Sequence, residues 1–456
     1  MIFLGKNNYL QVIQYSDVES WSTYSLLGKG LEFSKNYYLE RIGAFLIRNK
    51  TQVQVENGVL YKRPTIRTNG QGIRLRDEVD GKEIGTKNQF RIKQKQFLLS
   101  KIDARNGAFG VVPPELDNAI ITGNFWTFDV NYDKINPHYL ALVTMTKSFQ
   151  KLSQEASVGT TNRNYLQETQ FLNFKIPLPT LAEQKKIVDD YERKINEAKT
   201  LELNAENLES EIERYLFEEL GVQLEQKSNN HKGLQFVNFT DIERWDILFL
   251  MGQVDQIGSK YKIKKFSQVI TSFNKGQDGK SLRIDSSKFP QSDFRYIGME
   301  HIEKKTGTLL ELQNVKGGEI KSQTINVPRN FMIYGKLRPY LNKYWVNNTG
   351  FDNIICSSEF FVFDIDEEKL DKNFFKYVLA SEIIQSQIND KTSGARMPRI
   401  NEEIFFNLHF PIPEIQEQLK ISQKISSMKT EIALSKEKAK DLRVSAEEEF
   451  EKTIFQ

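Results

Sequence analysis

The sequence contains one cysteine and four histidines in 456 residues, so two common kinds of chemical site are missing. Cys356 alone cannot form an intramolecular disulfide or a multi-cysteine zinc site, which fits a reducing compartment. The histidines show no metal-ligand spacing; they stand at His138, His231, His301 and His409. We therefore expect no metal site in this chain.

Long hydrophobic runs are also missing, and none approaches the roughly 20 residues that a membrane helix needs. The opening stretch MIFLGKNNYLQ has no basic n-region, no sustained apolar core and no signal-peptide cleavage site. Apolar residues make up 39% of the chain and charged residues 27%, with a net charge of +3. We expect a cytoplasmic protein without a membrane contact, whose charge is compatible with nucleic-acid binding but does not indicate it.

Recognisable catalytic motifs are missing as well. GQDGKS, which starts at Gly276, resembles the end of a phosphate-binding loop, but Asn274 stands where that motif requires glycine. DDYERK, from Asp189, has the residue types of a metal-dependent nuclease, yet it lies in a helical pattern where such charges form a solvated face. Four scattered histidines offer no Ser/His/Asp or Cys/His set. The sequence predicts neither catalytic machinery nor a cofactor in this chain.

What the sequence does contain is a long internal repeat. FKIPLPTLAEQKKI is answered by LHFPIPEIQEQLKI, and LLSKIDAR and FWTFDV are answered by IYGKLRPY and FFVFDI. A further pair is QVIQYSDVESW and QFVNFTDIERW. The paired windows keep the same order in the chain, at offsets of 224, 235 and 234 residues. The pairs begin at Gln11 and Gln235, at Leu98 and Ile333, at Phe125 and Phe360, and at Phe174 and Leu408. This predicts a tandem duplication with pseudo-twofold symmetry.

Each copy begins with strand-like text and ends with helical text. Runs such as QFRIKQKQFLLSKI, FWTFDV and FFVFDI are β-rich, and a helical stretch follows them in both copies, PHYLALVTMTKSFQKLSQ and KNFFKYVLASEIIQSQIND. The predicted fold class is α+β, a duplicated mixed domain followed each time by a long helix. The predicted boundaries are 1–176 and 223–410 for the mixed domains, and 177–222 and 411–456 for the helices.

The doubled P-x-P marks the change from mixed domain to helix. Each proline fixes φ and disfavours helix in the residue before it, so the pair stops one element and starts the next. One copy alone is typical of an ordinary hinge. Two copies at matching places favour a repeated framework, with the prolines at Pro177, Pro179, Pro411 and Pro413.

Apolar residues recur at spacings of three and four in both helical segments, which is typical of a coiled-coil seam. Helices of about 40 residues would be about 60 Å long at 1.5 Å per residue. The predicted helix-pairing residues are Val188, Tyr191, Ile195, Leu201, Leu208 and Ile212 in the first segment, and Ile421, Ile425, Met428, Ile432 and Leu442 in the second.

Basic and amide side chains recur in predicted loops of both mixed domains. Arginine pairs with guanine, asparagine with adenine, and lysine or arginine with phosphate, so such a set can read duplex DNA. For any single residue, plain surface charge is the simpler interpretation; the repetition of the set favours DNA. The candidates are Arg74, Arg76, Lys101, Arg105, Asn162 and Arg163 in the first domain, and Lys336, Arg338, Tyr340, Arg396 and Arg399 in the second.

The layout resembles the specificity subunit of type I restriction-modification systems. The resemblance rests on the doubled P-x-P-x-x-x-E-Q signature before a long helix, and it covers essentially the whole chain. It implies two target-recognition domains, each reading one half of a split asymmetric DNA site, and two antiparallel helices that set the gap. It also implies a non-catalytic chain in phage defence.

The resemblance further implies partners and places the chemistry in them. These are double-stranded DNA, two methyltransferase subunits and motor-nuclease subunits, with S-adenosylmethionine, ATP and Mg bound by those subunits. The alternatives are a coiled-coil scaffold or adaptor for proteins, a DNA-recognition module of another methyltransferase or anti-phage complex, and an endonuclease built on DDYERK.

Overall fold

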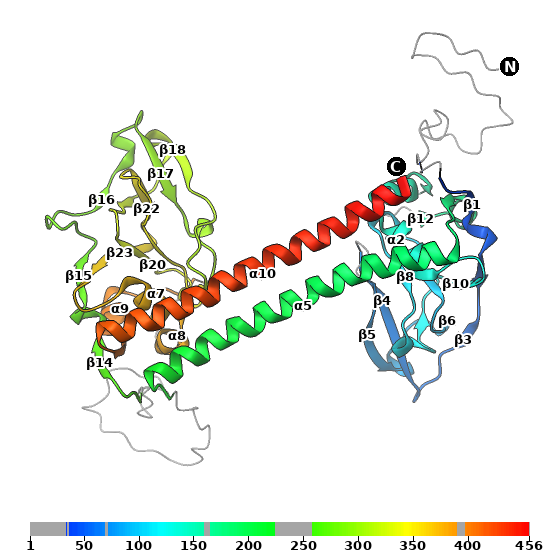
Figure 1. The fold of residues 1–456 in the computed structure, drawn as a ribbon, viewed down its shortest axis with the longest axis horizontal. Helices are drawn as coiled ribbons and strands as arrows, with labels where there is room; N and C mark the ends of the chain where they lie inside the picture. Colours follow the sequence, from blue (N-terminus) through cyan, green and yellow to red (C-terminus); the bar gives the residue numbers. More distant parts are fainter. Residues whose placement is uncertain are drawn as a thin grey trace, which may run out of the picture. The chain divides into compact units, whose positions relative to one another are not determined.

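In this computed structural model the chain is described at residues 33, 36–68, 72–158, 165–223, 258–389 and 397–455. The windows that begin at Gln11 and Gln235 lie outside these ranges. The chain forms two compact units. Unit 1 comprises Met1–Leu201 with Glu437–Gln456, and unit 2 comprises Glu202–Lys436. Each unit therefore contains one mixed domain and one half of each long helix (Figure 1).

A four-stranded antiparallel sheet in the order β2-β10-β7-β8 is the framework of unit 1. Two helices follow β10 and bury their apolar residues with those of the sheet, among them Phe97, Phe128, Tyr139 and Phe149. The bounds are β2 (Leu46–Asn49), β7 (Phe97–Ser100), β8 (Phe109–Val111), β10 (Phe125–Val130), α2 (Pro137–Met145) and α3 (Lys147–Glu155).

Unit 2 repeats this framework with a sheet in the order β15-β23-β20-β21. The central strands β10 and β23 have the same length and matching bounds, and the helices after them also correspond. The predicted α+β duplication is confirmed. The bounds are β15 (Ile270–Phe273), β20 (Met332–Gly335), β21 (Tyr344–Val346), β23 (Phe360–Ile365), α7 (Lys372–Ala380) and α8 (Glu382–Asn389).

The helical stretch expected after each central strand is present and consists of two helices. The breaks fall at Thr146 and Ser381, whose hydroxyls donate to Val143 O and Val378 O at 2.8 and 2.7 Å. Thr146 also caps α3, because its Oγ1 accepts from the Phe149 N–H. A helical periodicity that continues across such a residue hides the break, since short polar side chains favour caps over helix interiors.

The units differ in the strands outside the repeated framework. Unit 1 has a three-stranded sheet β3-β6-β9 and a hairpin β4-β5, whereas unit 2 has a five-stranded sheet β16-β19-β22-β17-β18. The bounds are β3 (Gln52–Gln54), β4 (Leu60–Ile66), β5 (Ile73–Asp80), β6 (Asn88–Arg91), β9 (Ile120–Ile121), β16 (Arg283–Ile284), β17 (Asp293–Ile297), β18 (Gln313–Lys316), β19 (Thr324–Asn326) and β22 (Ile354–Ser357).

Short elements complete both units and keep the repeat. Strand β1 pairs with β13 in unit 1, and β14 pairs with β24 in unit 2. Unit 1 also has the pair β11 and β12, which has no counterpart among the described residues of unit 2. The bounds are β1 (Leu39–Arg41), β11 (Ser157–Val158), β12 (Tyr165–Leu166), α4 (Glu168–Asn173), β13 (Lys175–Pro177), β14 (Lys262–Lys265), α9 (Glu402–Asn407) and β24 (His409–Ile412). The 3₁₀ helices are η2 (Ile42–Ala44), η3 (Gly81–Glu83), η4 (Ala104–Asn106), η5 (Pro114–Leu116), η7 (Phe266–Gln268), η8 (Ser286–Lys288), η9 (Met299–His301), η10 (Gly317–Glu319) and η11 (Pro339–Leu341).

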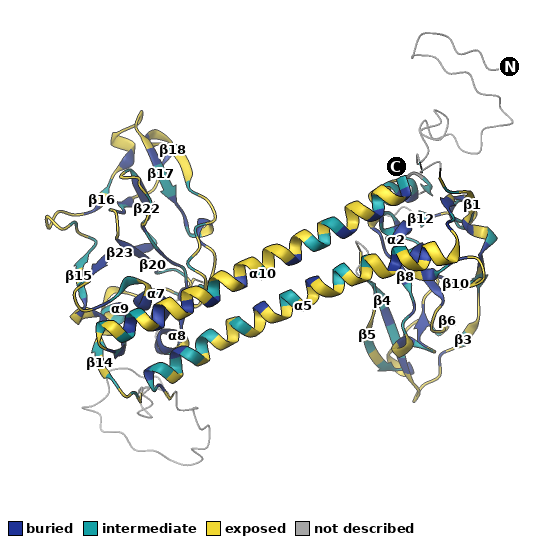
Figure 2. Ribbon diagram, in the orientation of Figure 1, coloured by how far each residue is buried: buried dark blue, intermediate teal, exposed yellow. Residues whose placement is uncertain are grey.

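The two long helices are α5 (Leu181–Leu220) and α10 (Ile415–Phe455). Both are largely exposed along their middle turns (Figure 2), as expected for helices with a narrow apolar seam. In unit 1 Lys194 pairs with Glu449, and Lys438 with Glu197 at 2.9 Å. In unit 2 Lys436 pairs with Glu209 at 2.7 Å. In these pairs the residue number rises along α5 while it falls along α10. The parts of α5 and α10 that lie in one unit therefore run antiparallel.

The predicted seam residues take graded positions on these helices. Val188, Ile421, Ile425, Met428 and Ile432 are buried. The others are half-buried, namely Tyr191, Ile195, Leu201, Leu208, Ile212 and Leu442. Alanines of the same periodicity are almost fully buried, which requires close neighbours around a very short side chain: Ala198, Ala205, Ala439 and Ala446.

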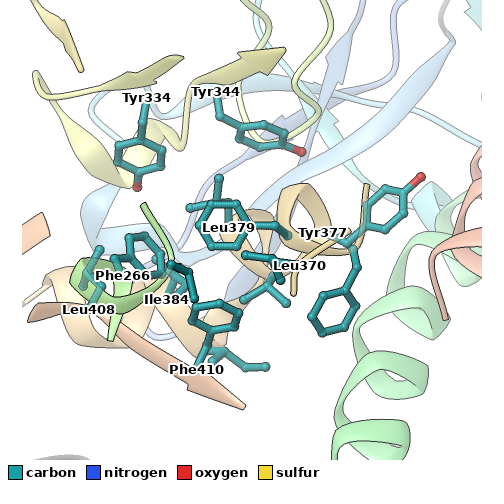
Figure 3. Close-up of a cluster of buried hydrophobic side chains, with 14 of the residues drawn as sticks. Phe266, Tyr334, Tyr344, Leu370, Tyr377, Leu379, Ile384, Leu408 and Phe410 are labelled. Atoms are coloured by element: carbon teal, nitrogen blue, oxygen red, sulfur yellow. The ribbon is translucent and has the colours of Figure 1, made fainter. Parts of the chain in front are cut away.

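The ends of the long helices enter the domain cores. In unit 2, Leu216 and Leu220 of α5 and Ile421 and Ile425 of α10 belong to one cluster with the aromatic core around Phe266 (Figure 3). In unit 1 the corresponding cluster includes Val188 of α5, together with Phe450 and Ile454 of α10. A helix end that buries such residues is stabilised by the domain, and the domain core is incomplete without it.

The doubled E-Q of the signature supplies a second anchor. Gln418 is fully buried in the first turn of α10. Its Nε2 donates to Pro413 O at 2.9 Å and Lys369 O at 3.0 Å, and its Oε1 accepts from the Asp371 N–H at 2.8 Å. This side chain therefore joins the start of the long helix to the start of α7.

Gln184 makes the matching contacts in unit 1. It is also fully buried, and its bonds to Pro179 O, Lys134 O and the Asn136 N–H measure 2.8, 3.2 and 2.7 Å. A buried amide with satisfied partners is costly to remove, because each partner is left unpaired. The P-x-P stops the strand, and the glutamine five residues after its last proline fixes the helix to the domain.

We predict that Gln418→Leu lowers the free energy of unfolding of unit 2 by about 3 kcal/mol, because three hydrogen bonds of about 1 kcal/mol each are lost. Native-state hydrogen exchange should show the loss at the amides of α7 and not at those of α2. The control is Gln416→Leu, since Gln416 is exposed on the same turn. Equal effects of the two substitutions would contradict the anchor.

Candidate functional site

In unit 2 the predicted residues after β20 are held by backbone bonds. The Lys336 N–H donates to Glu359 O at 2.8 Å, and the Ile400 N–H donates to Lys336 O at 3.2 Å. The Arg338 N–H donates to Pro398 O at 2.7 Å. Three segments that are separate in the chain thus form one surface, which we call the β20 cluster: Lys336, Arg338, Tyr340, Glu359 and Arg399.

The loop that carries this cluster has a constrained backbone. Arg338 and Asn342 both adopt the left-handed conformation, with φ of 49° and 46°. Asn342 is almost fully buried, and its Nδ2 donates to Leu379 O and Ala380 O, both at 3.0 Å. Such bonds hold a conformation that non-glycine residues otherwise avoid. Tyr340, on η11 between them, is 50% exposed.

Lys336 is a partly buried cation. Its Nζ lies 5.2 Å from the ring centroid of Phe361. Burial lowers the pKa of Lys336 below its usual value, and the neighbouring Glu359 carboxylate partly opposes this shift. The ammonium group of Lys336 therefore lies near an aromatic ring, which restricts the movement of the side chain.

Arg399 forms a two-point ion pair in the same cluster. Its Nε and Nη2 donate to the two carboxylate oxygens of Glu359 at 3.1 and 3.0 Å. The guanidinium holds the pKa of Glu359 below its usual range. The side chains of Arg399 and Glu359 are 43% and 31% exposed, so the pair lies at the surface.

Unit 1 has the same backbone arrangement around Lys101. The Lys101 N–H donates to Asn124 O at 2.9 Å, and the Leu166 N–H donates to Lys101 O at 3.0 Å. The Lys101 Nζ lies 5.8 Å from the ring centroid of Trp126 and 6.0 Å from that of Tyr165. We call Lys101, Arg105, Asn124 and Tyr165 the β7 cluster.

Charge and burial around Lys101 differ from those around Lys336. Burial lowers the pKa of Lys101, and the nearby Arg48 guanidinium lowers it further. Arg48 is itself partly buried, 5.5 Å from the ring centroid of Phe128 and 3.7 Å from Glu168. Arg105 lies on η4 and is half-buried. Arg48 also lies 6.0 Å from the ring centroid of Trp126, so Arg48 and Lys101 share this aromatic ring.

The loop placement expected for Arg74 and Arg76 is wrong. Both lie in strand β5 of the β4–β5 hairpin, where they are exposed. The Arg76 Nε pairs with Asp77 at 3.1 Å. Arg76 also lines a cleft of about 240 Å³ with Thr122 and Phe125. None of the contacts described for the structure joins either arginine to Lys101.

Three predicted DNA-contacting residues cannot be placed. Asn162, Arg163 and Arg396 lie outside the described residues. The structure therefore unites Lys336, Arg338 and Arg399 through backbone bonds and locates Lys101 at the matching place.

Sequence reasoning passed over three residues of these clusters. Asn124 and Glu359 directly precede the matched windows FWTFDV and FFVFDI, so an extension of that alignment by one residue would have found them. Tyr165 and Arg399 occupy corresponding places, because each directly precedes the residue whose backbone N–H donates to the carbonyl oxygen of the cluster lysine. Both clusters thus have a lysine at the same place, and they differ in the side chains around it.

Other chemistry is limited in the described part of the chain. No group of three or more histidine, cysteine, aspartate or glutamate side chains there could hold a metal ion. Burial raises the pKa of the Cys356 thiol, which disfavours the reactive thiolate. Among the described helices, none combines the length and apolar character that crossing a membrane requires.

Comparison with known proteins gives the family. The model of the type I restriction modification DNA specificity domain matches residues 43–214 and 258–443, which together are more than half of the chain. The chain belongs to this family. The resemblance drawn from the doubled signature is confirmed, and each match contains one of the two clusters described above.

Individual relatives are distant. The specificity subunit of the type I restriction enzyme MjaVIII of Methanocaldococcus jannaschii is 22% identical over 289 residues, which are 60% of this chain and 59% of that protein. The chain thus matches less than two thirds of that relative's length. A solved structure from work on complex assembly and conformational transition of the type I R-M system aligns over 92% of this chain and 98% of its own, at 14% identity and a TM-score of 0.55. This likeness shows a shared fold.

Proposed function

We propose that this member of the family is a non-catalytic subunit that directs a restriction-modification complex to a bipartite, asymmetric DNA site. Each mixed domain reads one half-site, and the long helices set the gap. The observation that carries the proposal is the pair of matched clusters, which share a backbone frame and a lysine on an aromatic ring but differ in the side chains around it.

A shared frame with different neighbours suits the reading of two different sequences. Contacts to phosphate position a protein on DNA, and contacts to base edges specify the sequence. Lys101 and Lys336 suit the first role, because a cation can approach any duplex backbone. The differing residues, Asn124 and Tyr165 in unit 1 and Arg399 in unit 2, suit the second role.

The catalytic steps belong to partner subunits in this proposal. Two methyltransferase subunits would use S-adenosylmethionine, and motor-nuclease subunits would use ATP and Mg. The complex would act in the cytoplasm, where it protects the host genome by methylation and restricts foreign DNA. The family membership and the relative named for a specificity subunit support this assignment.

The direct test is to express the chain with its methyltransferase partners in a host without restriction systems and to map methylated bases in the genome. We expect one split asymmetric motif, with two half-sites separated by a fixed gap. Cells with the partners alone are the control. Methylation without a sequence motif, or a motif that does not need this chain, would refute the proposed function.

We predict that Lys101→Gln and Lys336→Gln each weaken DNA binding by the assembled complex. If each amine contacts a phosphate, the slope of log K against log salt becomes shallower by about 0.9 per substitution, since one fewer counterion is released. Titrations at several salt concentrations measure this. Lys321→Gln is the control, because Lys321 is an exposed lysine of unit 2 outside the cluster. Unchanged slopes for both cluster variants would contradict phosphate contacts.

A second prediction concerns the gap. Inserting seven residues near Leu201 in α5 and near Ser435 in α10 keeps the seam in phase and lengthens each helix by about 10 Å. The mapped motif should keep both half-sites and acquire a longer gap. An insertion of seven residues in α5 alone is the control and should disturb pairing. A gap unchanged by the double insertion would show that the helices do not set it.

A further inference from the structure

Arg399 uses one side of its guanidinium within the protein. A guanidinium has five N–H donors in a fixed plane. The Nε and one Nη2 donor are bound to Glu359, and one Nη1 donor lies 3.4 Å from Met397 O. Among the described residues, one donor on each terminal nitrogen has no partner, and the two terminal nitrogens are the atoms that form the end-on fork of an arginine.

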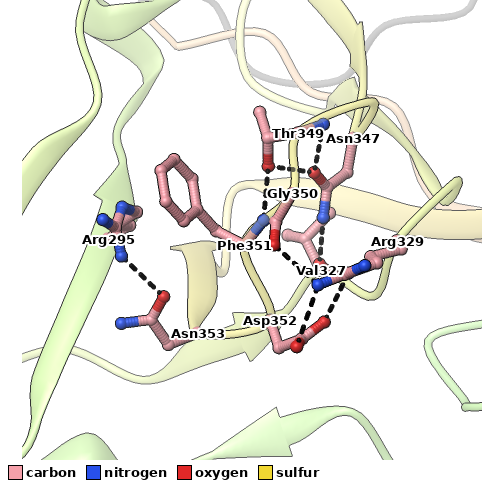
Figure 4. A network of polar contacts seen from close by, with 9 residues as sticks. All are labelled: Arg295, Val327, Arg329, Asn347, Thr349, Gly350, Phe351, Asp352 and Asn353. Atoms are coloured by element: carbon pink, nitrogen blue, oxygen red, sulfur yellow. Dashed lines mark hydrogen bonds and ion pairs between the residues drawn. The ribbon is translucent and has the colours of Figure 1, made fainter.

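Another arginine of unit 2 shows what a purely structural pair looks like. Arg329 donates through Nε and Nη2 to Asp352 at 2.6 and 3.2 Å, just as Arg399 does to Glu359. Its Nη2 also donates to Gly350 O at 2.6 Å, which fixes the loop before β22 (Figure 4). Both donors of Nη2 are therefore used, and the end-on fork is not available.

We propose that Arg399 reads a guanine in one half-site, and that Glu359 is the positioning residue that holds its guanidinium for this contact. The proposal deepens the DNA-recognition function above and rests on it. Two parallel N–H donors match the O6 and N7 acceptors that guanine presents in the major groove. Arg399, with 43% of its side chain exposed, keeps one donor on each terminal nitrogen for such a contact.

The position of Glu359 argues for this role over simple attraction to phosphate. A carboxylate at a DNA-facing surface repels the phosphates, so a cluster built only for phosphate contacts gains nothing from it. Glu359 lies between Lys336 and Arg399, and both cations lower its pKa. The carboxylate thus stays charged, and it restricts the arginine to one orientation before DNA binds, which reduces the entropy lost on binding.

The matched cluster of unit 1 carries no such pair. Tyr165 stands at the place of Arg399 and Asn124 at the place of Glu359. Tyrosine cannot form a fork with guanine, so the inferred contact belongs to the second domain alone. The guanine that Arg399 contacts should therefore occur in one half-site of the mapped motif.

The test uses the full chain assembled with its methyltransferase partners and duplexes that contain the mapped motif. Each guanine of the motif is replaced in turn by 7-deazaguanine, which lacks the N7 acceptor but keeps O6 and base pairing. We expect one guanine at which the replacement weakens wild-type binding about tenfold. With Arg399→Gln the same replacement should have no further effect, because the contact is already lost.

Two further variants separate the roles. Arg399→Lys keeps the charge and a donor for guanine but loses the planar fork that Glu359 orients, so it should weaken the preference for guanine at the same position less than Arg399→Gln does. Glu359→Gln should weaken that preference several-fold while other positions keep theirs, a pattern that general misfolding would not give. Arg329→Gln is the matched control and should keep the full sensitivity to 7-deazaguanine.

The outcomes distinguish this inference from the function on which it rests. If the wild-type complex shows no sequence preference, the proposed function fails. If it keeps a bipartite motif and Arg399→Gln either weakens all sequences equally or leaves every guanine as sensitive as before, only the guanine contact is overturned.

Discussion

The packing of long-helix ends into the domain cores is the constraint on which the rest of the structure depends. Each core is completed by residues from two helices that belong to distant parts of the sequence, such as Leu220 and Ile421 in unit 2 and Val188 and Phe450 in unit 1. Apolar burial supplies most of the stabilisation, and Gln184 and Gln418 add direction through their fixed hydrogen bonds. A domain anchored in this way holds its surface loops at a defined place on a rigid helix.

The same framework carries two different sets of surface side chains. The central strands β10 and β23 pair in matching register with the strands that precede Lys101 and Lys336, so the two lysines occupy corresponding places. Mutations in Asn124, Tyr165, Glu359 or Arg399 change exposed or half-buried side chains, whereas the backbone bonds that position them stay in place. The surface chemistry can therefore diverge while the fold is kept, because the side chains of the clusters and the side chains of the core are different residues.

Much of this architecture was predictable because it depends on local patterns. The doubled windows, the P-x-P stops and the spacing of three and four gave the duplication and the two long helices, which form as α5 and α10. The breaks at Thr146 and Ser381 were hidden, since a capping hydroxyl does not interrupt the apolar periodicity. The strand position of Arg74 and Arg76 was missed because the β4–β5 hairpin is stabilised by pairing between strands instead of a strong local signal.

The sequence by itself determined the repeat, the α+β class, the helical seams and the lysines of the two clusters, since each follows from spacing or composition. Only the tertiary structure decided that Glu359 holds Arg399 and that Tyr165 and Asn124 replace this pair in unit 1. Those partners lie about 40 residues apart in the chain, and sequence spacing says nothing about such contacts. They meet because backbone hydrogen bonds bring residues that are distant in the chain to one edge of the sheet.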